Sequence, residues 1–224
     1  MRVDAAPLQR SLASRMRILM VNYEYPPLGG GGGIATRDIA VELAKRHEVD
    51  VLTSSGPDLA PEEVCDGVRI YRAPVLGRTK LPTASILSMV SFWPIGIRHG
   101  RKVTAGRSYD VVNSWFAVPS GPTGVHLARY LGAPHVLTMA GGDIYDPSKW
   151  YTPDKNPLLG AAVRRVLAAS DGHVAVSSDL ARRARSLYGF DGPIDVISLG
   201  AAGEVGRHRD VAVRRGQHPP HRGT

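Results

Sequence analysis

Five consecutive glycines, Gly29–Gly33, stand directly before a predicted helix. Bare glycine amides at a helix N-terminus let an anion approach closely, and the helix dipole favours its negative charge. The run therefore predicts a turn that binds phosphate, with a flexible linker as the alternative. A P-loop is excluded, since no Lys-Ser or Lys-Thr pair follows. The dinucleotide-binding fingerprint fits only loosely, through Gly30, Gly32 and Ala35, and leaves a nicotinamide-type site as a weak alternative.

Two further segments place chemically useful residues directly after predicted strands. Trp115 and Phe116 lie in the segment NSWFAVPSG, directly after a predicted strand. At this position they form either an apolar wall of a cleft or part of the core. MAGGDIYD sets Asp143 after a Gly-Gly pair, where its carboxylate either accepts hydrogen bonds from sugar hydroxyls or tightens a turn. Ligands of open α/β sheets bind beyond the carboxyl ends of the strands, so we expect both loops to share one edge with Gly29–Gly33.

Other chemistries find little support in the sequence. The histidines lack metal-ligand spacing and no HExxH, CxxC or GxSxG motif occurs, so we expect no metal and no cofactor. The single cysteine, Cys65, cannot form an internal disulfide, and no secretory signal is apparent, which favours a cytoplasmic protein. The net charge of +8 comes from scattered basic residues, which argues against a nucleic-acid partner. The apolar stretch around Phe92-Trp93 is assigned to the core, with peripheral contact at the inner membrane face as the alternative.

Strands that alternate with helices must position these loops, which predicts one doubly wound, parallel, Rossmann-like α/β domain. Apolar runs predict strands, and amphipathic or capped segments between them predict helices. The expected strands are residues 17–22, 48–53, 68–71, 109–113, 135–138, 173–176 and 194–198. The expected helices are residues 34–46, 81–103 with a break near Pro94, and 121–131, then one opened by Asn156-Pro157 that reaches Ala168, and one capped by Ser177 or Ser178 that reaches Tyr188.

Composition divides the chain into three parts. Residues 1–15 are polar and aperiodic, which predicts a flexible leader, or a start at Met16 instead. Residues 16–200 carry the alternating elements of the single domain. Residues 201–224 are rich in Arg, His, Pro and Gly, which predicts a disordered basic tail or a segment outside its natural reading frame.

The ordered segments together resemble the large retaining glycosyltransferase family of GT-B architecture, of the family four type. Its members typically open with a strand, a proline-containing loop and a Gly-Gly turn into the first helix, as in RILMVNYEYPPLGGGGGIATRD. Its next signatures are similar to YDVVNSWFAVPSGPTG and PHVLTMAGGDIYD, and the end of its N-terminal domain to DGHVAVSSDLARRARSLYGFDGPIDVISLG. The likeness spans residues 16–200.

The resemblance implies the N-terminal half of a two-domain enzyme. This half holds a sugar or lipid-linked acceptor, and its glycine turn approaches the diphosphate of a nucleotide-sugar donor. The candidate substrate-binding residues are then Gly30, Gly31, Gly32, Gly33, Trp115 and Asp143. No catalytic residue is assigned, because many relatives have histidine in the segment occupied here by Asn113, Ser114 and Trp115.

The donor-binding half of that family, with its Arg/Lys pair and glutamate motif, has no counterpart in this sequence. We therefore expect a missing C-terminal domain or a partner chain to complete the donor site. The alternative is an inactive truncated remnant, or a non-catalytic Rossmann-like binding module completed by another chain.

The composition of the C-terminal segment makes a prediction for limited proteolysis. Between Gly203 and Thr224 the only branched apolar residues are three valines, whose burial contributes about 5 kcal/mol at most. Ordering each residue costs about 1–2 kcal/mol, so this segment is expected to lie outside the core. Trypsin should remove it quickly and leave a resistant core that ends near Gly200, as mass spectrometry of the fragments would show. A tail as resistant as the core contradicts the prediction.

Overall fold

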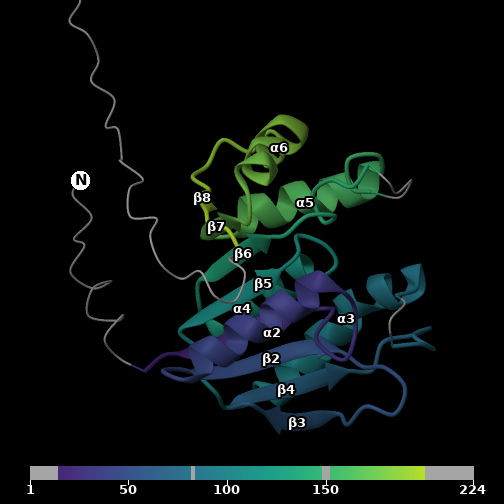
Figure 1. Cartoon of the computed structure of the whole chain (residues 1–224), viewed down its shortest axis with the longest axis vertical. Coiled ribbons are helices and arrows are strands. Elements are labelled where there is room, and N and C mark those ends of the chain that lie inside the picture. The colour runs from purple at the N-terminus through teal and green to yellow at the C-terminus, as the bar shows by residue number, and fades with distance from the viewer. Residues whose placement is uncertain (1–14, 82–83, 148–151, 200–224) are drawn as a thin grey trace, which may run out of the picture.

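The computed structural model describes residues 15–81, 84–147 and 152–199, and these form an α/β domain around one mixed sheet (Figure 1). The seven predicted strands are present as β1 (Arg17–Asn22), β2 (Glu48–Ser54), β4 (Val68–Ala73), β5 (Val111–Trp115), β6 (His135–Met139), β7 (Gly172–Ala175) and β8 (Asp195–Val196). They pair in parallel in the order β4-β2-β1-β5-β6-β7-β8. The expected Rossmann-like fold is confirmed. Of the leader expected at residues 1–15, all but Arg15 lies outside the described residues, as does the tail expected at residues 201–224.

Five helices connect the strands and follow the predicted order. They are α2 (Gly31–Ala44), α3 (Ile86–Val103), α4 (Ser120–Leu131), α5 (Pro157–Ala169) and α6 (Ser178–Tyr188). The predicted caps are present, since the Asn156 side chain accepts hydrogen bonds from the first backbone N–H groups of α5 at 3.0 and 3.2 Å. The Ser177 side chain caps α6, and Gly189 ends that helix in the left-handed conformation.

The structure corrects three expectations about these elements. First, an unexpected strand, β3 (Glu62–Cys65), pairs antiparallel with β4 at one edge of the sheet. All of its residues are exposed, so it lacks the apolar signature of a buried strand. Second, α3 continues through Pro94, because Val90 and Pro94 are exposed and water can solvate the carbonyl group that proline leaves without a donor. Third, α2 begins at Gly31 rather than at Ile34.

Side chains alternate between the two faces of the central strands and build separate core clusters. Ile18 and Met20 of β1 pack with Ala40 of α2 on one face. Leu19 and Val21 pack on the other face in a cluster that contains Phe92 of α3 and Leu127 of α4. A third cluster, built around Leu137, Met139, Val163, Val166 and Ala181, joins β6 to α5 and α6. Helices therefore cover both faces, and the loops that leave the strand ends remain at the edge.

The close contact of α4 with β5 depends on Gly124. A Cβ atom at this position would lie 1.8 Å from the Ser114 hydroxyl oxygen and 2.8 Å from Nε2 of His135. That hydroxyl group is hydrogen-bonded to His135 Nε2 at 2.9 Å inside the core, where burial lowers the pKa of His135 to about 4. The neutral imidazole bridges Ser114 to Ser170, which lies 2.9 Å from Nδ1.

Replacing Gly124 with Ala should therefore destabilise the protein, although alanine normally favours a helix by about 0.5–1 kcal/mol over glycine. The steric conflict should outweigh that gain and lower the free energy of unfolding by about 1–3 kcal/mol. Urea unfolding followed by circular dichroism measures the change, with the exposed His126→Ala in the same helix as the control. A Gly124→Ala variant as stable as wild type contradicts the packing described above.

Candidate functional site

The ends of the central strands bring three loops together at what we call the carboxyl edge, the edge formed by the C-terminal ends of the parallel strands. β1 lies between β2 and β5. Asn22 at the end of β1 pairs with Trp115 at the end of β5, and Trp115 pairs with Thr138 of β6. The order of the strands reverses direction here, and open α/β sheets bind ligands at such a point. The loops after β1, β5 and β6 therefore form the candidate site.

The loop after β1 is held in place by polar contacts before it reaches the glycines. The backbone N–H of Tyr23 donates to the Ser120 hydroxyl oxygen at 3.0 Å, and the Ser54 hydroxyl donates to the Tyr23 carbonyl oxygen at 2.7 Å. The Asn22 side chain bonds Thr36 of α2 at 2.6 Å and accepts from the backbone N–H of Glu24 at 2.8 Å. The start of α2 is thereby fixed relative to the end of β1.

Only part of the glycine run faces open space. Gly30 is the N-cap residue of α2 and Gly31 its first residue; both are exposed, and a Cβ atom on either would meet nothing within 4 Å. The first turn of a helix carries backbone N–H groups without partners in the helix, and the helix dipole adds positive potential there. Gly30 and Gly31 therefore leave room for an anion at the start of α2.

The neighbouring glycines are required by packing instead. A Cβ atom on Gly32 would lie 2.4 Å from Cζ of Phe116, and one on Gly33 would lie 2.3 Å from the Glu24 carbonyl oxygen. Gly29 has a φ of +77°, a conformation that side chains resist. Gly30 and Gly31 thus face open space, whereas Gly32 and Gly33 are packed against other residues. A flexible linker would not require glycine at positions 29, 32 and 33.

Phe116, rather than Trp115, meets the glycine turn. Phe116 is half-buried against Gly32 and has a φ of 77°, which is strained for an aromatic residue. Its N–H donates to the Thr138 carbonyl oxygen at 3.0 Å, and its carbonyl oxygen accepts from the Gly121 N–H at 3.1 Å. Two hydrogen bonds to different elements thus hold the strained backbone.

Trp115 packs in the core, with an exposed fraction of 3%. Its indole nitrogen has no hydrogen-bond partner among the described residues. The core alternative stated for this residue therefore fits its position, and Trp115 does not line the open part of the edge. Successive side chains of a strand point to opposite faces, so the residue next to the buried Trp115 is expected to point away from the core. This alternation is the sequence signal that favours Phe116 over Trp115.

Asp143 joins the loop after β6 to the loop after β5. One carboxylate oxygen accepts from the backbone N–H of Ala117 at 2.8 Å. The other accepts from the N–H groups of Ala140 and Gly141 at 3.2 and 2.9 Å. Burial raises the pKa of Asp143 to about 6 against these stabilising bonds. Both carboxylate oxygens accept backbone hydrogen bonds, so Asp143 is suited to holding the two loops beside Phe116 in place. This fits the alternative that Asp143 tightens a turn.

A buried cation at the same edge was missed by sequence reasoning. Arg78, in the loop between β4 and α3, has its guanidinium 5.0 Å from the centre of the Tyr23 ring. It donates to the Ser54 hydroxyl oxygen and to the Leu81 carbonyl oxygen, both at 3.1 Å, and its Nε has no partner. Among the described residues it forms no ion pair with a carboxylate. It adds positive charge beside the loop after β1, and a single arginine in an irregular loop carries no sequence signal.

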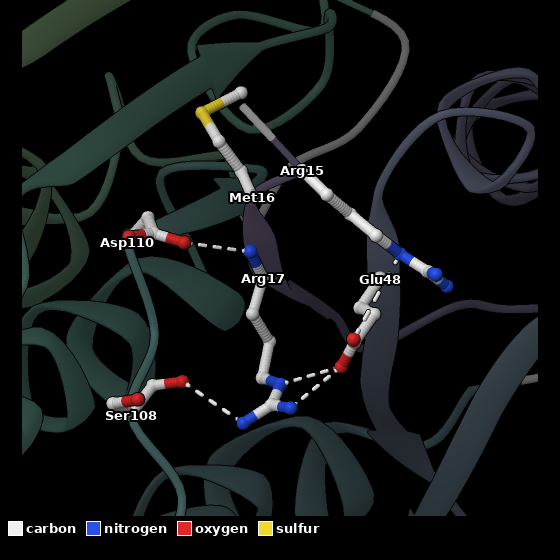
Figure 2. A pocket seen from close by; sticks show the side chains of 6 residues that line it. All are labelled: Arg15, Met16, Arg17, Glu48, Ser108 and Asp110. Carbon is white, nitrogen blue, oxygen red and sulfur yellow. Dashed lines mark hydrogen bonds and ion pairs between the residues drawn. The ribbon is translucent and has the colours of Figure 1, made fainter. Parts of the chain in front are cut away.

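A small pocket at the opposite edge of the sheet does not compete with this site. Figure 2 shows Arg15, Met16, Arg17, Glu48, Ser108 and Asp110 around it. Its charges bind each other, since the Arg17 guanidinium pairs with Glu48 at 2.6 Å and the Arg17 N–H donates to Asp110 at 2.7 Å. Within the described ranges, no cluster of three or more His, Cys, Asp or Glu residues is placed to hold a metal ion.

The buried carboxylate of Asp143 predicts a pH-dependent stability. Unfolding returns its pKa from about 6 to its ordinary value of 3.8, so the native state binds more protons between these values. Wild-type stability, relative to the non-titrating Asp143→Asn variant, should therefore fall as the pH rises from about 4 to about 6 and level off above 7. Thermal unfolding of both proteins across this range measures the difference. A constant difference would show that Asp143 ionises normally in the native state.

Comparison with known proteins bears on the family and the fold of the chain. The model of Glycosyltransferase Family 4 matches residues 29–202. The D-inositol 3-phosphate glycosyltransferase of Rhodococcus erythropolis is 27% identical over 187 residues, which cover 77% of this chain and 40% of that protein. A sucrose-phosphate synthase structure from Thermosynechococcus elongatus has a TM-score of 0.68 at 17% identity, over 82% of this chain and 48% of that one.

A UDP-glucosyltransferase structure from Polygonum tinctorium is similar over 88% of this chain and 55% of its own length, with a TM-score of 0.55 at 12% identity. The chain thus spans 40% of the curated relative and about half of each solved chain. The structural likeness shows the shared fold, and the family match covers most of the described residues. The chain therefore belongs to glycosyltransferase family 4, of which it forms an N-terminal domain of GT-B fold.

Proposed function

We propose that this chain is the acceptor-side domain of an enzyme that transfers a sugar from a nucleotide-sugar donor to an acceptor with retention at the anomeric carbon. The observation that carries the proposal is the open start of α2, where Gly30 and Gly31 leave space above the first helical N–H groups. A donor diphosphate at this position would meet backbone N–H groups and the positive end of the helix dipole. We expect the enzyme to act in the cytoplasm.

In the proposed reaction an acceptor hydroxyl oxygen forms a bond to the anomeric carbon, while the bond from that carbon to the diphosphate oxygen breaks. The helix start stabilises the charge that develops on the leaving diphosphate, so the step needs no metal ion. The proton of the acceptor hydroxyl passes to the departing phosphate oxygen on the same face of the sugar. Asp143 is a poor candidate for that proton, because three backbone N–H groups already bind its oxygens.

A second domain has to bind the nucleotide in this proposal, since the chain spans only 40% of the Rhodococcus relative. That domain belongs either to the same polypeptide or to a partner chain. The proposed acceptor is a sugar or a lipid-linked molecule. The alternative function is that of an inactive remnant or a non-catalytic binding module, which assays of the chain with and without a donor-binding domain distinguish.

The first experiment measures turnover of nucleotide sugars by the 224-residue chain, alone and fused to the donor-binding half of the Rhodococcus relative. Inositol phosphate and lipid-linked sugars serve as acceptors. Transfer by the fused protein, with retention established by NMR of the product, supports the proposal. A folded fusion that binds the donor but transfers nothing to any acceptor would favour the binding-module alternative.

The second experiment tests the glycine turn in the fused protein. Gly31→Val should lower kcat/KM for the donor about tenfold or more, equivalent to about 1.4 kcal/mol, because the branched side chain occupies the space above the first turn. Gly31 is preferred to Gly32, whose replacement would collide with Phe116. The control is Asp38→Val, which puts the same side chain on an exposed position two turns along α2. Equal activities of the two variants would mean that the turn does not approach the donor.

A further inference from the structure

The first half of α3 exposes a row of large apolar side chains. Ile86, Leu87, Val90 and Trp93 have exposed fractions of 55, 56, 61 and 51%, and we call these four residues the apolar face of α3. Their spacing of one and three residues places them on one side of the helix. Gly77 lies against Leu87, so the exposed Leu76 in the preceding loop extends the same surface. Figure 1 shows this part of α3 on the outside of the domain.

This exposure is selective rather than a general property of the helix. Phe92 is completely buried and forms an edge-to-face contact with Tyr23, as its assignment to the core predicted. The adjacent Trp93 is half exposed, which corrects the core assignment for that residue. Leaving large apolar side chains in water is unfavourable, and clusters of such residues mark interaction surfaces.

The positive charge of the segment around α3 favours a negatively charged partner for the apolar face. From Pro74 to Tyr109 the chain contains no Asp or Glu and six basic residues, Arg78, Lys80, Arg98, Arg101, Lys102 and Arg107. Lys80, Arg98 and Lys102 are exposed. Exposed Lys and Arg side chains are attracted to an anionic membrane surface.

We propose that the apolar face of α3 docks on an anionic lipid surface. Tryptophan and branched aliphatic side chains with flanking lysine and arginine are the composition that helices use to lie in a membrane interface. A second copy of this chain would bring like charges together at the same surface, and nucleic acid would leave the apolar side chains exposed. An anionic lipid surface offers acyl chains to the apolar side chains and negatively charged headgroups to the lysine and arginine side chains.

Docking through this face would also bring the carboxyl edge close to the membrane. The Ser88 hydroxyl, one turn into α3, lies 2.5 Å from the Tyr23 hydroxyl in the loop that leads to the glycines. The Ser85 side chain caps α3 and donates to the Gly77 carbonyl oxygen at 2.8 Å, which ties the Arg78 loop to the helix start. The inference goes beyond the proposed transfer reaction, and its test requires no enzymatic activity.

Co-flotation of the purified 224-residue chain with vesicles tests the proposal. Vesicles of phosphatidylcholine alone are compared with vesicles that contain about one third phosphatidylglycerol. Wild type should float with the anionic vesicles, and its binding should weaken as salt is raised. The double variant Val90→Gln/Trp93→Gln should bind about tenfold more weakly, and Arg98→Gln/Lys102→Gln should lose its preference for anionic lipid. Leu158→Gln, at an 83% exposed leucine of α5, is the matched control.

Circular dichroism melts establish that each variant is folded. The proposal is overturned if wild type floats with neither vesicle, or if Leu158→Gln weakens binding as much as the α3 variants. Concentration-dependent dimerisation that Val90→Gln/Trp93→Gln abolishes would also overturn it, since a second copy would then cover the face. Loss of vesicle binding on fusion to the donor-binding half would assign the face to a domain interface instead.

Discussion

The parallel pairing of β1 with β5 is the contact on which the arrangement of the candidate site depends. From this pair the chain winds outward to β2 and β4 on one side and to β6, β7 and β8 on the other. The loops after β1 and β5 lead into α2 and α4. Asn22 and Trp115 are register partners, and Phe116, the first residue after β5, meets Gly32 of the glycine turn. A shift of one residue in this register would exchange Trp115 and Phe116 between core and edge.

Hydrogen bonds that involve backbone groups carry most of the organisation of the edge. Asp143 binds N–H groups from two loops, and Phe116 is held between β6 and α4 by its own peptide groups. Gly30 and Gly31, which border the open space at the start of α2, present backbone groups only. This arrangement suits a site that binds a charged ligand through amides, since backbone donors need no conformational ordering when the ligand arrives.

The sequence predicted the elements well where they leave a periodic or capping signature. The buried strands are short apolar runs, and Asn156, Ser177 and Gly189 bound their helices as their side chains and backbone freedom require. It failed for β3, whose four exposed residues gain their order from pairing with β4 rather than from burial. A strand that is held only by pairing with its neighbour shows no alternation of apolar and polar residues. β3 therefore could not be predicted from its own four residues.

The candidate site was predicted in part. The three loops were identified because each follows a strand, which is a property of chain order. The roles inside the loops depended on contacts between segments far apart in sequence. The Phe116 ring fills the space beside Gly32, and the Ala117 N–H donates to the Asp143 carboxylate. The Arg78 guanidinium lies over the Tyr23 ring. No spacing rule reports such contacts, which explains why Phe116, although named as a possible cleft wall, was left out of the substrate-binding residues, and why Arg78 was not identified.

The two outer strands give the sheet unequal edges. β3 presents Glu62 and Glu63, and Glu63 is paired with the buried Arg72, so charge on this edge discourages another strand from adding to it. β8 has only two residues, and the adjoining Ile197 and Leu199 are exposed at 58 and 44%. Among the described residues, charged side chains therefore mark the β3 edge, whereas exposed apolar side chains lie beside β8. The exposed apolar side chains beside β8 make Ile197 the place to introduce a lysine when a monodisperse domain is wanted.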